Sequence, residues 1–398
     1  MSVNRQVAIA NNEPRVSISI PGFAAPAEIR DDSHGGPGPQ PVRRPVSLEA
    51  VIWTSPVFVV GCPRSGTTLV QTMLDSHPRL SVLYEADALV DIPLGLRSRL
   101  ANASEALTLA EVYPNSRAHS FDARTARAVC RELGITDAAG AMRVLAASQA
   151  LAQGKRRWGN KTPKALLHLA ELAIVYPDAQ FIHVIRDGRD SASSQARVFD
   201  GSVVQGALLW RTGMRTGRRA GSRLGPDRYL EVRLEELLSS PERQIRRMCA
   251  FLGEDFDQSM LHSNTAARER IPPSVLTIHP RLGEPPRPLP PSRDGATTGL
   301  VQRAVAALID AELVELGYLP AASSGRCRRI VYVIIGYTFF LVSLRRNLRE
   351  LFRHLARSGG ARRAARSVTR QSVGRQIQGG TLPRRAATPA PAEALDEP

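Results

Sequence analysis

The chain has 398 residues, with 53 Lys and Arg against 37 Asp and Glu and a formal net charge of +16. Between Arg326 and Pro398 there are 15 arginines and 4 acids, a net charge of +11, which leaves +5 for the rest of the chain. The excess charge thus lies in a tail, which argues against a nucleic-acid-binding surface spread over the fold. The 4 cysteines are widely spaced, which argues against a metal site and a disulfide framework.

Composition divides the chain into four parts. Residues 1–50 are rich in Gly, Pro and charge and are expected to be disordered, as is the basic tail 358–398. Residues 51–322 have the patterned composition of a folded domain, and residues 326–357 hold an apolar segment between basic clusters. The first ten residues show no basic start followed by an apolar run, so we expect no signal peptide and a cytoplasmic location.

A glycine-bounded loop begins the folded part. Gly61-Cys62-Pro63-Arg64-Ser65-Gly66-Thr67-Thr68 follows the apolar run Pro56 to Val60 and precedes an amphipathic segment. Strand, loop and helix in this order direct backbone N–H groups at a phosphate. The glycine spacing is that of a Walker A loop, but Thr67 stands where an NTPase needs Lys. The loop is therefore predicted to bind an anion, and it is poorly suited to a γ-phosphate.

Helices and strands alternate after this loop. The pattern predicts helices within 86–153, a helix opened by Lys161-Thr162-Pro163 and ending at Val175, a strand over 180–185, helices near 191–197 and 204–219, and a strand over 227–233. A helix over 240–253, a loop over 272–291 and a closing helix over 301–316 complete it. This alternation predicts an α/β fold with three α/β/α layers around a central parallel sheet.

A second charged motif follows the strand Gln180 to Ile185. It reads Arg186-Asp187-Gly188-Arg189-Asp190, with Ser194 a few residues later. An Arg at the carboxyl end of a parallel strand lies where open α/β sheets bind ligands. Together with the Ser194 hydroxyl it can hold one phosphate. Arg189 and Asp190 are expected to hold the turn through an ion pair.

The two motifs, P-R-S-G-T-T over 63–68 and R-D-G-R-D-x-x-x-S over 186–194, resemble those of the sulfotransferases that use 3′-phosphoadenosine 5′-phosphosulfate (PAPS). The resemblance covers about 51–319 and implies a P-loop NTPase-like sulfotransferase fold, PAPS as sulfate donor and no metal. It implies that the 5′-phosphosulfate is held by Arg64, Ser65, Gly66, Thr67 and Thr68, and the 3′-phosphate by Arg186 and Ser194. The late basic loop of this family has no clear counterpart, and Arg287 and Arg293 are the candidates for its role.

Transfer of a sulfuryl group needs a base for the acceptor proton and a cation for the developing charge. Glu85 is the expected general base, because it follows the segment returning from the loop helix and matches the spacing of the catalytic Glu in protein-tyrosine sulfotransferases, which look similar here. Asp87 is its nearest competitor. Lys161, in W-G-x-K-T-P, resembles a family motif and is the expected second cation, at a helix start that favours anions. Arg64 is the other candidate for the sulfuryl oxygens.

The acceptor is expected to be a hydroxyl or amine of a small molecule, a glycan or a lipid-linked molecule. Specificity is assigned to the segments between Glu85 and Lys161 and from Ala266 to Arg293. Ile330 to Leu344 is an uncharged run of 15 residues, short of the roughly 20 that a membrane-spanning helix needs. Membrane-surface attachment, docking on a protein and a true span all remain open. The alternatives for the whole chain are a P-loop kinase or NTPase, and an inactive membrane-surface protein acting through its basic tail.

Overall fold

The computed structural model describes residues 46–95, 102–113, 119, 121–199, 202–265, 273–288 and 299–320. All of them belong to the first of two units into which the chain divides, Met1–Tyr337 and Thr338–Pro398. The expectations for residues 1–45, for Arg293, for Ile330 to Leu344 and for the basic tail lie outside the described residues.

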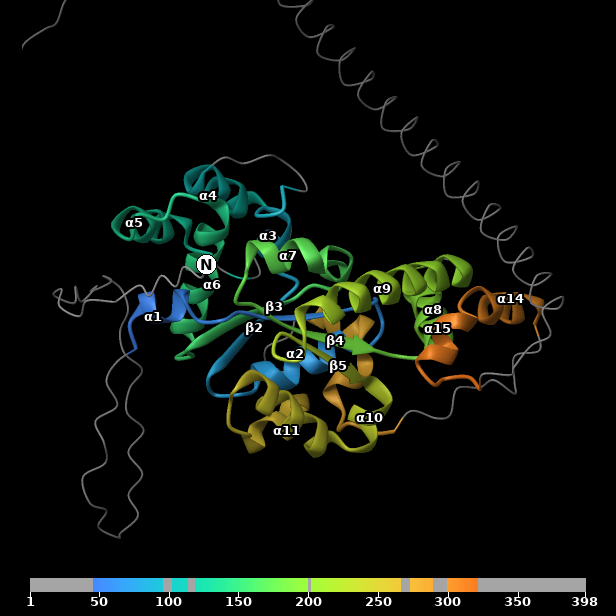
Figure 1. Cartoon of the computed structure of the whole chain (residues 1–398). Helices are drawn as coiled ribbons and strands as arrows, with labels where there is room; N and C mark the ends of the chain where they lie inside the picture. The colour runs from blue at the N-terminus through green and yellow to red at the C-terminus, as the bar shows by residue number, and fades with distance from the viewer. Residues whose placement is uncertain are drawn as a thin grey trace, which may run out of the picture. The chain divides into compact units, whose positions relative to one another are not determined.

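A parallel sheet forms the centre of the described fold (Figure 1). Its five strands lie in the order β2-β3-β1-β4-β5, and every neighbouring pair is parallel. The strands are β1 (Val57–Gly61), β2 (Leu80–Tyr84), β3 (Arg157–Lys161), β4 (Gln180–Ile185) and β5 (Tyr229–Arg233). The parallel sheet expected from the alternation of elements is confirmed.

Helices cover both faces of this sheet (Figure 1). On one face Val57 and Val59 of β1 belong to a core that includes buried residues of α2 and α11. On the other, Phe58 lies 5.3–6.2 Å, centroid to centroid, from the rings of Trp158, Tyr176 and Phe181. Successive side chains of a strand point to opposite faces, so a strand buried on both sides is apolar throughout. The three-layer arrangement is therefore confirmed.

The helices that pack around the sheet have the following bounds. The face with Val57 and Val59 carries α2 (Thr67–Asp75), α10 (Leu234–Ser239), α11 (Pro241–Leu252) and η3 (Gln258–His262). The layer with Phe58 contains α1 (Leu48–Ile52), η2 (Pro163–His168), α7 (Leu169–Val175), α8 (Gly188–Val198) and α9 (Val203–Leu224).

The described parts of the segment between β2 and β3 are mainly helical, as predicted. It contains α3 (Ala88–Asp91), α4 (Ala103–Val112), α5 (Ala123–Glu132) and α6 (Ala138–Ala152). Asn102, Asp122 and Asp137 cap α4, α5 and α6 by accepting hydrogen bonds from backbone N–H groups of the first turn. α6 then packs on β2 and β3 and anchors the insertion to the sheet.

Two expectations about local structure are wrong. Lys161 does not open a helix, because it is the last residue of β3 and the chain continues into the 3₁₀ helix η2. The described part of 272–291 is not a loop throughout, because it contains α13 (Pro273–Ile278) and η4 (Pro280–Gly283). Both begin with proline, which is compatible with a first helical turn. The closing helix is two helices, α14 (Leu300–Leu308) and α15 (Asp310–Glu315).

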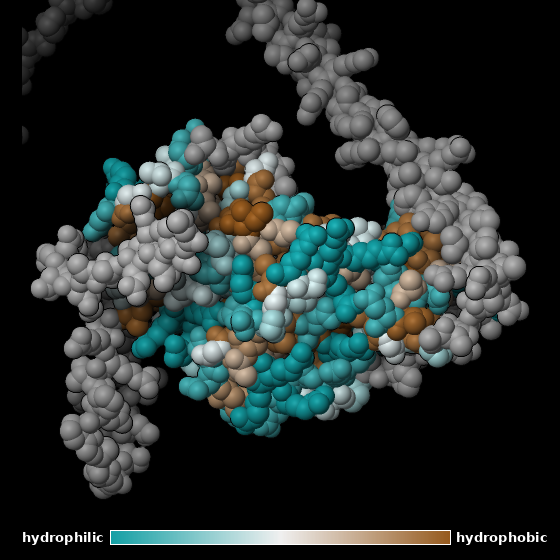
Figure 2. All heavy atoms as spheres, in the orientation of Figure 1, coloured by the Kyte–Doolittle hydropathy of each residue, from teal (hydrophilic) through white to brown (hydrophobic). Residues whose placement is uncertain are grey.

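The surface shown in Figure 2 is mainly hydrophilic over α9 and α11, with hydrophobic residues in smaller separate areas. This agrees with helices whose apolar faces pack against the sheet. Within the described ranges, no helix has the length and apolar character needed to cross a membrane.

Candidate active site

The site lies where the carboxyl ends of the strands meet. Because all five strands are parallel, their last residues lie along one edge of the sheet. The five last residues are Gly61, Tyr84, Lys161, Ile185 and Arg233. Both charged motifs and both expected catalytic side chains stand at or directly after these positions. The sheet thus brings together segments that are more than a hundred residues apart in sequence.

The loop after β1 has the conformation expected of an anion cradle. Arg64 and Gly66 have positive φ angles, +70° and +94°, and α2 begins directly afterwards at Thr67. Gly66 caps this helix without a side chain, so the first N–H groups of α2 are left for a ligand. Thr67, at the position of the Walker lysine, is 4% exposed and cannot extend like a lysine.

Gly66 is also required by the packing beneath the loop. A Cβ atom on Gly66 would lie 2.6 Å from Cδ1 of Leu234, which follows β5. We expect Gly66→Ala to lower the midpoint of thermal unfolding by about 5 °C, from strain plus overpacking. The matched control is Gly154→Ala, because Gly154 also has a positive φ, +69°, but no atom within 4 Å of such a Cβ. Equal decreases in the unfolding midpoint for the two substitutions would show that the contact with Leu234 adds nothing to the strain of the positive φ.

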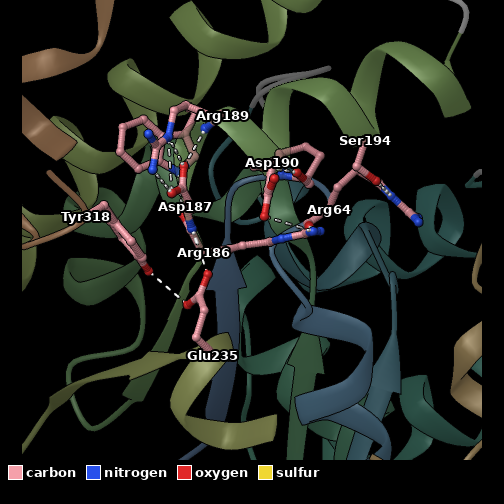
Figure 3. A network of polar contacts seen from close by, with 11 residues as sticks. Arg64, Arg186, Asp187, Arg189, Asp190, Ser194, Glu235 and Tyr318 are labelled. Atoms are coloured by element: carbon pink, nitrogen blue, oxygen red, sulfur yellow. Dashed lines mark hydrogen bonds and ion pairs between the residues drawn. The ribbon is translucent and has the colours of Figure 1, made fainter. Parts of the chain in front are cut away.

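The two motifs contact each other directly (Figure 3). Arg186 Nη1 donates to the backbone oxygen of Arg64 at 3.1 Å, and Arg64 Nε donates to Ser194 Oγ at 3.3 Å. Ser191 Oγ donates to the backbone oxygen of Pro63 at 3.0 Å. The turn after β4 therefore holds the loop after β1 in place, and the Arg64 and Arg186 side chains lie side by side with Ser194.

The turn after β4 is held by a network that differs from the expectation. Arg189 pairs with Asp187 at 2.6 Å, and Asp190 lies 3.7 Å from Arg186, whereas an ion pair between Arg189 and Asp190 was expected to hold this turn. The reason is that Asp187 caps α8, accepting from the Arg189 backbone N–H, which brings the Arg189 side chain back over Asp187. Asp190 lies one helical turn after Arg186 and faces it.

Three residues that sequence reasoning missed complete this network: Trp210, Glu235 and Tyr318, of which Figure 3 labels the last two. Trp210 Nε1 donates to the Arg186 backbone oxygen at 3.0 Å. Glu235 accepts from the Asp187 backbone N–H and from the Tyr318 hydroxyl, each at 3.0 Å. Each stands on a different element, so no local motif links it to the turn.

A cavity of about 1230 Å³ opens beside the two motifs. Six of the seven residues predicted to hold the donor line it, and Ser65 is fully buried behind them. Among the residues that the structure describes, seven arginines and two acids line the cavity, so it favours an anionic ligand. The arginines are Arg64, Arg186, Arg189, Arg197, Arg281, Arg287 and Arg303, and the acids are Asp190 and Glu284.

The buried polar atoms of the site fit a phosphate-bearing ligand. Within the described residues, Arg186 Nε and Ser65 Oγ are buried without a hydrogen-bond partner. Burial and the neighbouring Arg186 charge lower the pKa of Arg64. An anion between the two guanidinium groups would offset their repulsion and satisfy such donors. The hydrogen-bond donors of this site therefore suit the phosphate groups of PAPS.

Glu85 and Lys161 form an ion pair next to this site. Lys161 Nζ lies 2.7 Å from Glu85 Oε1 and 3.7 Å from the centroid of the Tyr84 ring. The Lys161 side chain is fully buried, whereas that of Glu85 is 33% exposed. Neither residue lines the large cavity. The Arg64 charge nevertheless contributes to the lowered pKa of Lys161, which places the pair within electrostatic reach of the loop.

The backbone holds Glu85 in an unusual conformation. Its φ is +48°, and its N–H donates to the Lys161 backbone oxygen at 2.8 Å. Asn160, fully buried, accepts from the Ala86 N–H at 3.1 Å and donates to the Ala86 oxygen at 3.2 Å. A strained, tightly held residue at a strand end is typical of functional sites. Asp87, the competitor, instead pairs with Lys164 at 2.9 Å.

Lys161 and Lys164 are expected to change the unfolding free energy with pH in opposite directions. Burial lowers the pKa of Lys161 to about 8, against 10.5 ordinarily, although Glu85 raises it. The folded state therefore binds fewer protons than the unfolded state between these values, and the contribution of Lys161 to the unfolding free energy rises with pH in that window. Asp91 and Asp87 raise the pKa of Lys164, so its contribution falls as pH rises past its ordinary value.

The measurement is chemical denaturation of the wild type, Lys161→Met and Lys164→Met from neutral pH upward. The difference between wild type and Lys161→Met is expected to grow between about pH 8 and pH 10.5. The difference between wild type and Lys164→Met is expected to shrink above that window. The same trend in both variants would contradict a lowered pKa for the buried Lys161 side chain.

One further side chain in the site was not predicted. Arg64 Nη1 lies 3.0 Å from Nδ1 and 3.2 Å from Nε2 of His279, and Arg64 Nη2 donates to the Ile278 backbone oxygen at 3.0 Å. No sequence signal marks His279, because its neighbours were taken for a loop. Arg287, one of the two late basic candidates, lines the cavity and is exposed.

Comparisons with known proteins agree with this geometry. Residues 56–258, just over half of the chain, match the model of the family described as "Sulfotransferase family". The chain is 29% identical over 219 residues to protein-tyrosine sulfotransferase 1 of Danio rerio, covering 52% of this chain and 55% of that protein. It is 28% identical over 214 residues to the protein-tyrosine sulfotransferase of Drosophila melanogaster, covering 52% and 39%.

A solved structure is also similar. It is the sulfotransferase domain of the olefin synthase of Synechococcus PCC 7002, with 22% identity, a TM-score of 0.42, and coverage of 72% of this chain and 94% of that domain. The matches to curated relatives span about half the length of those proteins or less. The family match covers β1 to β5 and both charged motifs. The chain belongs to the sulfotransferase family.

Proposed function

We propose that the protein transfers the sulfuryl group of PAPS to a hydroxyl or amine of an acceptor. One observation carries the proposal: Arg64, Arg186 and Ser194 meet beside a large basic cavity, within electrostatic reach of the Lys161–Glu85 pair. This arrangement supplies two anion-holding cations and a separate carboxylate with a partly exposed side chain. Membership of the sulfotransferase family supports the same reaction.

The donor would be held at two points. The N–H groups at the start of α2, with Arg64, Thr67 and Thr68, are assigned to the 5′-phosphosulfate. Arg186 and Ser194 are assigned to the 3′-phosphate. The direct contacts between the motifs set the distance between the two points, because the Arg186 guanidinium is fixed to the Arg64 backbone. Such preorganisation reduces the entropy that binding must overcome.

Glu85 is proposed as the general base. The acceptor oxygen or nitrogen forms a bond to sulfur, the bond between sulfur and the bridging oxygen of the 5′-phosphate breaks, and the acceptor proton passes to the Glu85 carboxylate. Lys161 holds that carboxylate through Oε1 at 2.7 Å. The Lys161 ammonium and the Arg64 guanidinium place positive charge close to the oxygens that gain negative charge in the transition state. No step requires a metal ion.

The acceptor would enter from the side of the helical insertion, since Glu85 and Asp87 begin that segment. We propose a small-molecule, glycan or lipid-linked acceptor and a cytoplasmic protein. The uncharged run Ile330 to Leu344, between basic clusters, supports attachment at the cytoplasmic face of a membrane.

A ligand panel tests the proposal. We expect 3′-phosphoadenosine 5′-phosphate (PAP), the product left by the donor, to raise the unfolding temperature without metal, and ATP with Mg²⁺ to raise it less. Incubation of the full chain with ³⁵S-labelled PAPS and extracts of its source organism should label an acceptor. A preference for ATP with Mg²⁺ would favour a kinase or NTPase instead. A response to anionic vesicles alone would favour a membrane-surface protein without transferase activity.

A further inference from the structure

The segment around His279 lies directly on the candidate donor site. Both Nη atoms of Arg64 contact this segment. Arg64 Nη1 contacts the His279 ring, and Arg64 Nη2 donates to the Ile278 backbone oxygen. Leu282 packs with Leu69 of α2 and with Leu276, which fixes the segment on the loop helix. His279, Arg281 and Leu282 all line the basic cavity.

The His279 ring stands among cations. Arg64 comes from the loop after β1, and Lys161 ends β3; both charges, after burial, lower the pKa of His279 to about 4. Among the described residues, the other charged groups nearby are the Glu85 carboxylate bound by Lys161 and the remaining charged side chains that line the same cavity: Arg186, Arg189, Asp190, Arg197, Arg281, Glu284, Arg287 and Arg303. The neutral ring therefore accepts a hydrogen bond from Arg64 through whichever nitrogen carries the lone pair.

An anion bound at Arg64 would add negative charge to the positively charged surroundings of the His279 ring. Negative charge next to the ring offsets the Arg64 and Lys161 charges that disfavour the imidazolium. A protonated imidazole also offers two N–H donors, where the neutral ring offers one. The ring is then better suited to donate to the bound phosphate or sulfate oxygen than to accept from Arg64.

We propose that His279 is a further anion-holding side chain of the donor site, and that donor binding is coupled to uptake of a proton on its imidazole. The inference rests on the proposed function. The late segment would thus contribute to the donor site through His279 at Arg64, whereas sequence reasoning looked for its contribution, at the 3′-phosphate, in Arg287 or Arg293. It also makes donor affinity depend on pH through a residue that stands outside both motifs.

The experiment is calorimetric titration of the full chain with PAP at about pH 6.5, near the ordinary pKa of histidine. It is carried out in PIPES and in imidazole, two buffers of different ionisation enthalpy. The number of protons exchanged follows from the difference in binding enthalpy between the buffers. PAP phosphates release protons of their own, so the quantity compared is the difference between wild type and His279→Gln. The matched control is His262→Gln, because His262 is exposed on η3 and does not line the cavity.

We expect wild type and His262→Gln to take up more protons than His279→Gln, and His279→Gln to bind PAP about tenfold more weakly at this pH. Equal proton exchange in all three proteins would overturn the inference. Tighter binding by His279→Gln would also overturn it, because His279 would then compete with the donor. Failure of the wild type to bind PAP would overturn the proposed function as well, whereas PAP binding without a difference at His279 would overturn this inference alone.

Discussion

Replacing Glu85 by Gln is expected to reduce sulfuryl transfer by about 10³-fold while PAP binding persists. The magnitude is that of a lost general base. PAP binding should persist because Glu85 does not line the cavity that contains both charged motifs. The measurement is the initial rate of transfer of labelled sulfate, with PAP affinity determined on the same preparation.

The same substitution should also change Lys161. The carboxylate is the largest contribution that raises the pKa of this buried amine, so its loss drives the pKa further down. The unfolding free energy should fall by about 1–3 kcal/mol, because a buried group loses its charged partner. This loss distinguishes Glu85 from a carboxylate on the protein surface, whose replacement would leave stability unchanged.

Asp87→Asn is the matched control for Glu85→Gln. Asp87 lies two residues away and also pairs with a lysine, Lys164, at 2.9 Å. The Asp87→Asn variant should transfer the sulfuryl group at a rate within a few-fold of the wild-type rate. If Asp87→Asn loses transfer and Glu85→Gln retains it, the base is Asp87. If Glu85→Gln also abolishes PAP binding, the residue acts on the donor site and not on the acceptor proton.

Replacing Arg186 by Lys is the second large change, and it should weaken PAP binding by about 10- to 100-fold. Lysine keeps the positive charge but not the planar fork. Arg186 uses Nη1 to hold the Arg64 backbone and leaves Nε buried and, within the described residues, without a partner. A lysine ammonium carries its three donors on one nitrogen and not along a planar fork, so it is poorly placed to hold the loop and a phosphate together, and the effect combines lost contacts with a loosened Arg64.

Arg197→Lys tests whether the loss of affinity is specific to position 186, since both substitutions keep the positive charge. Arg197 lines the same cavity, is exposed, and influences Arg64 through its charge. We expect its replacement to change PAP affinity by less than about threefold. Equal losses in both variants would mean that replacing any arginine of the cavity with lysine weakens binding, and would remove Arg186 from its special role. Unchanged affinity in both variants would mean that the cavity attracts the ligand only through its overall charge, which lysine keeps. Isothermal titration at fixed ionic strength is the appropriate measurement.

Sequence patterns predicted the parts of the structure that depend only on residues close together in the chain. The run before Gly61 is apolar throughout, as a strand buried on both faces must be, and the loop after it needs glycine at φ +94°. These local requirements predicted β1, the anion loop and α2. For the same reason β4, its following turn and the helical insertion after Glu85 were predicted with useful boundaries.

The strand β3 could not be predicted from local sequence patterns. Its residues, R-W-G-N-K, contain no apolar run, yet all five are buried. Arg157 is tolerated there because its side chain donates to the backbone oxygens of Ser55 and Leu252, at 2.6 and 2.7 Å. Its partners lie about a hundred residues away in either direction, so the strand has no local signature. The misplacement of Lys161 at a helix start follows directly from this missing strand.

The sequence by itself determined the chemistry available to this protein: an anion loop without a lysine, an Arg and Ser motif, and a carboxylate at the right distance along the chain. Only the tertiary structure decided which of these groups meet. β3 and β4 flank β1, so Lys161, the anion loop and Arg186 stand at one edge of the sheet, and Glu85 joins them from β2. His279 reaches the same edge on a separate segment. Strand order and the docking of distant segments arise from burial summed over the whole fold, which no short pattern contains.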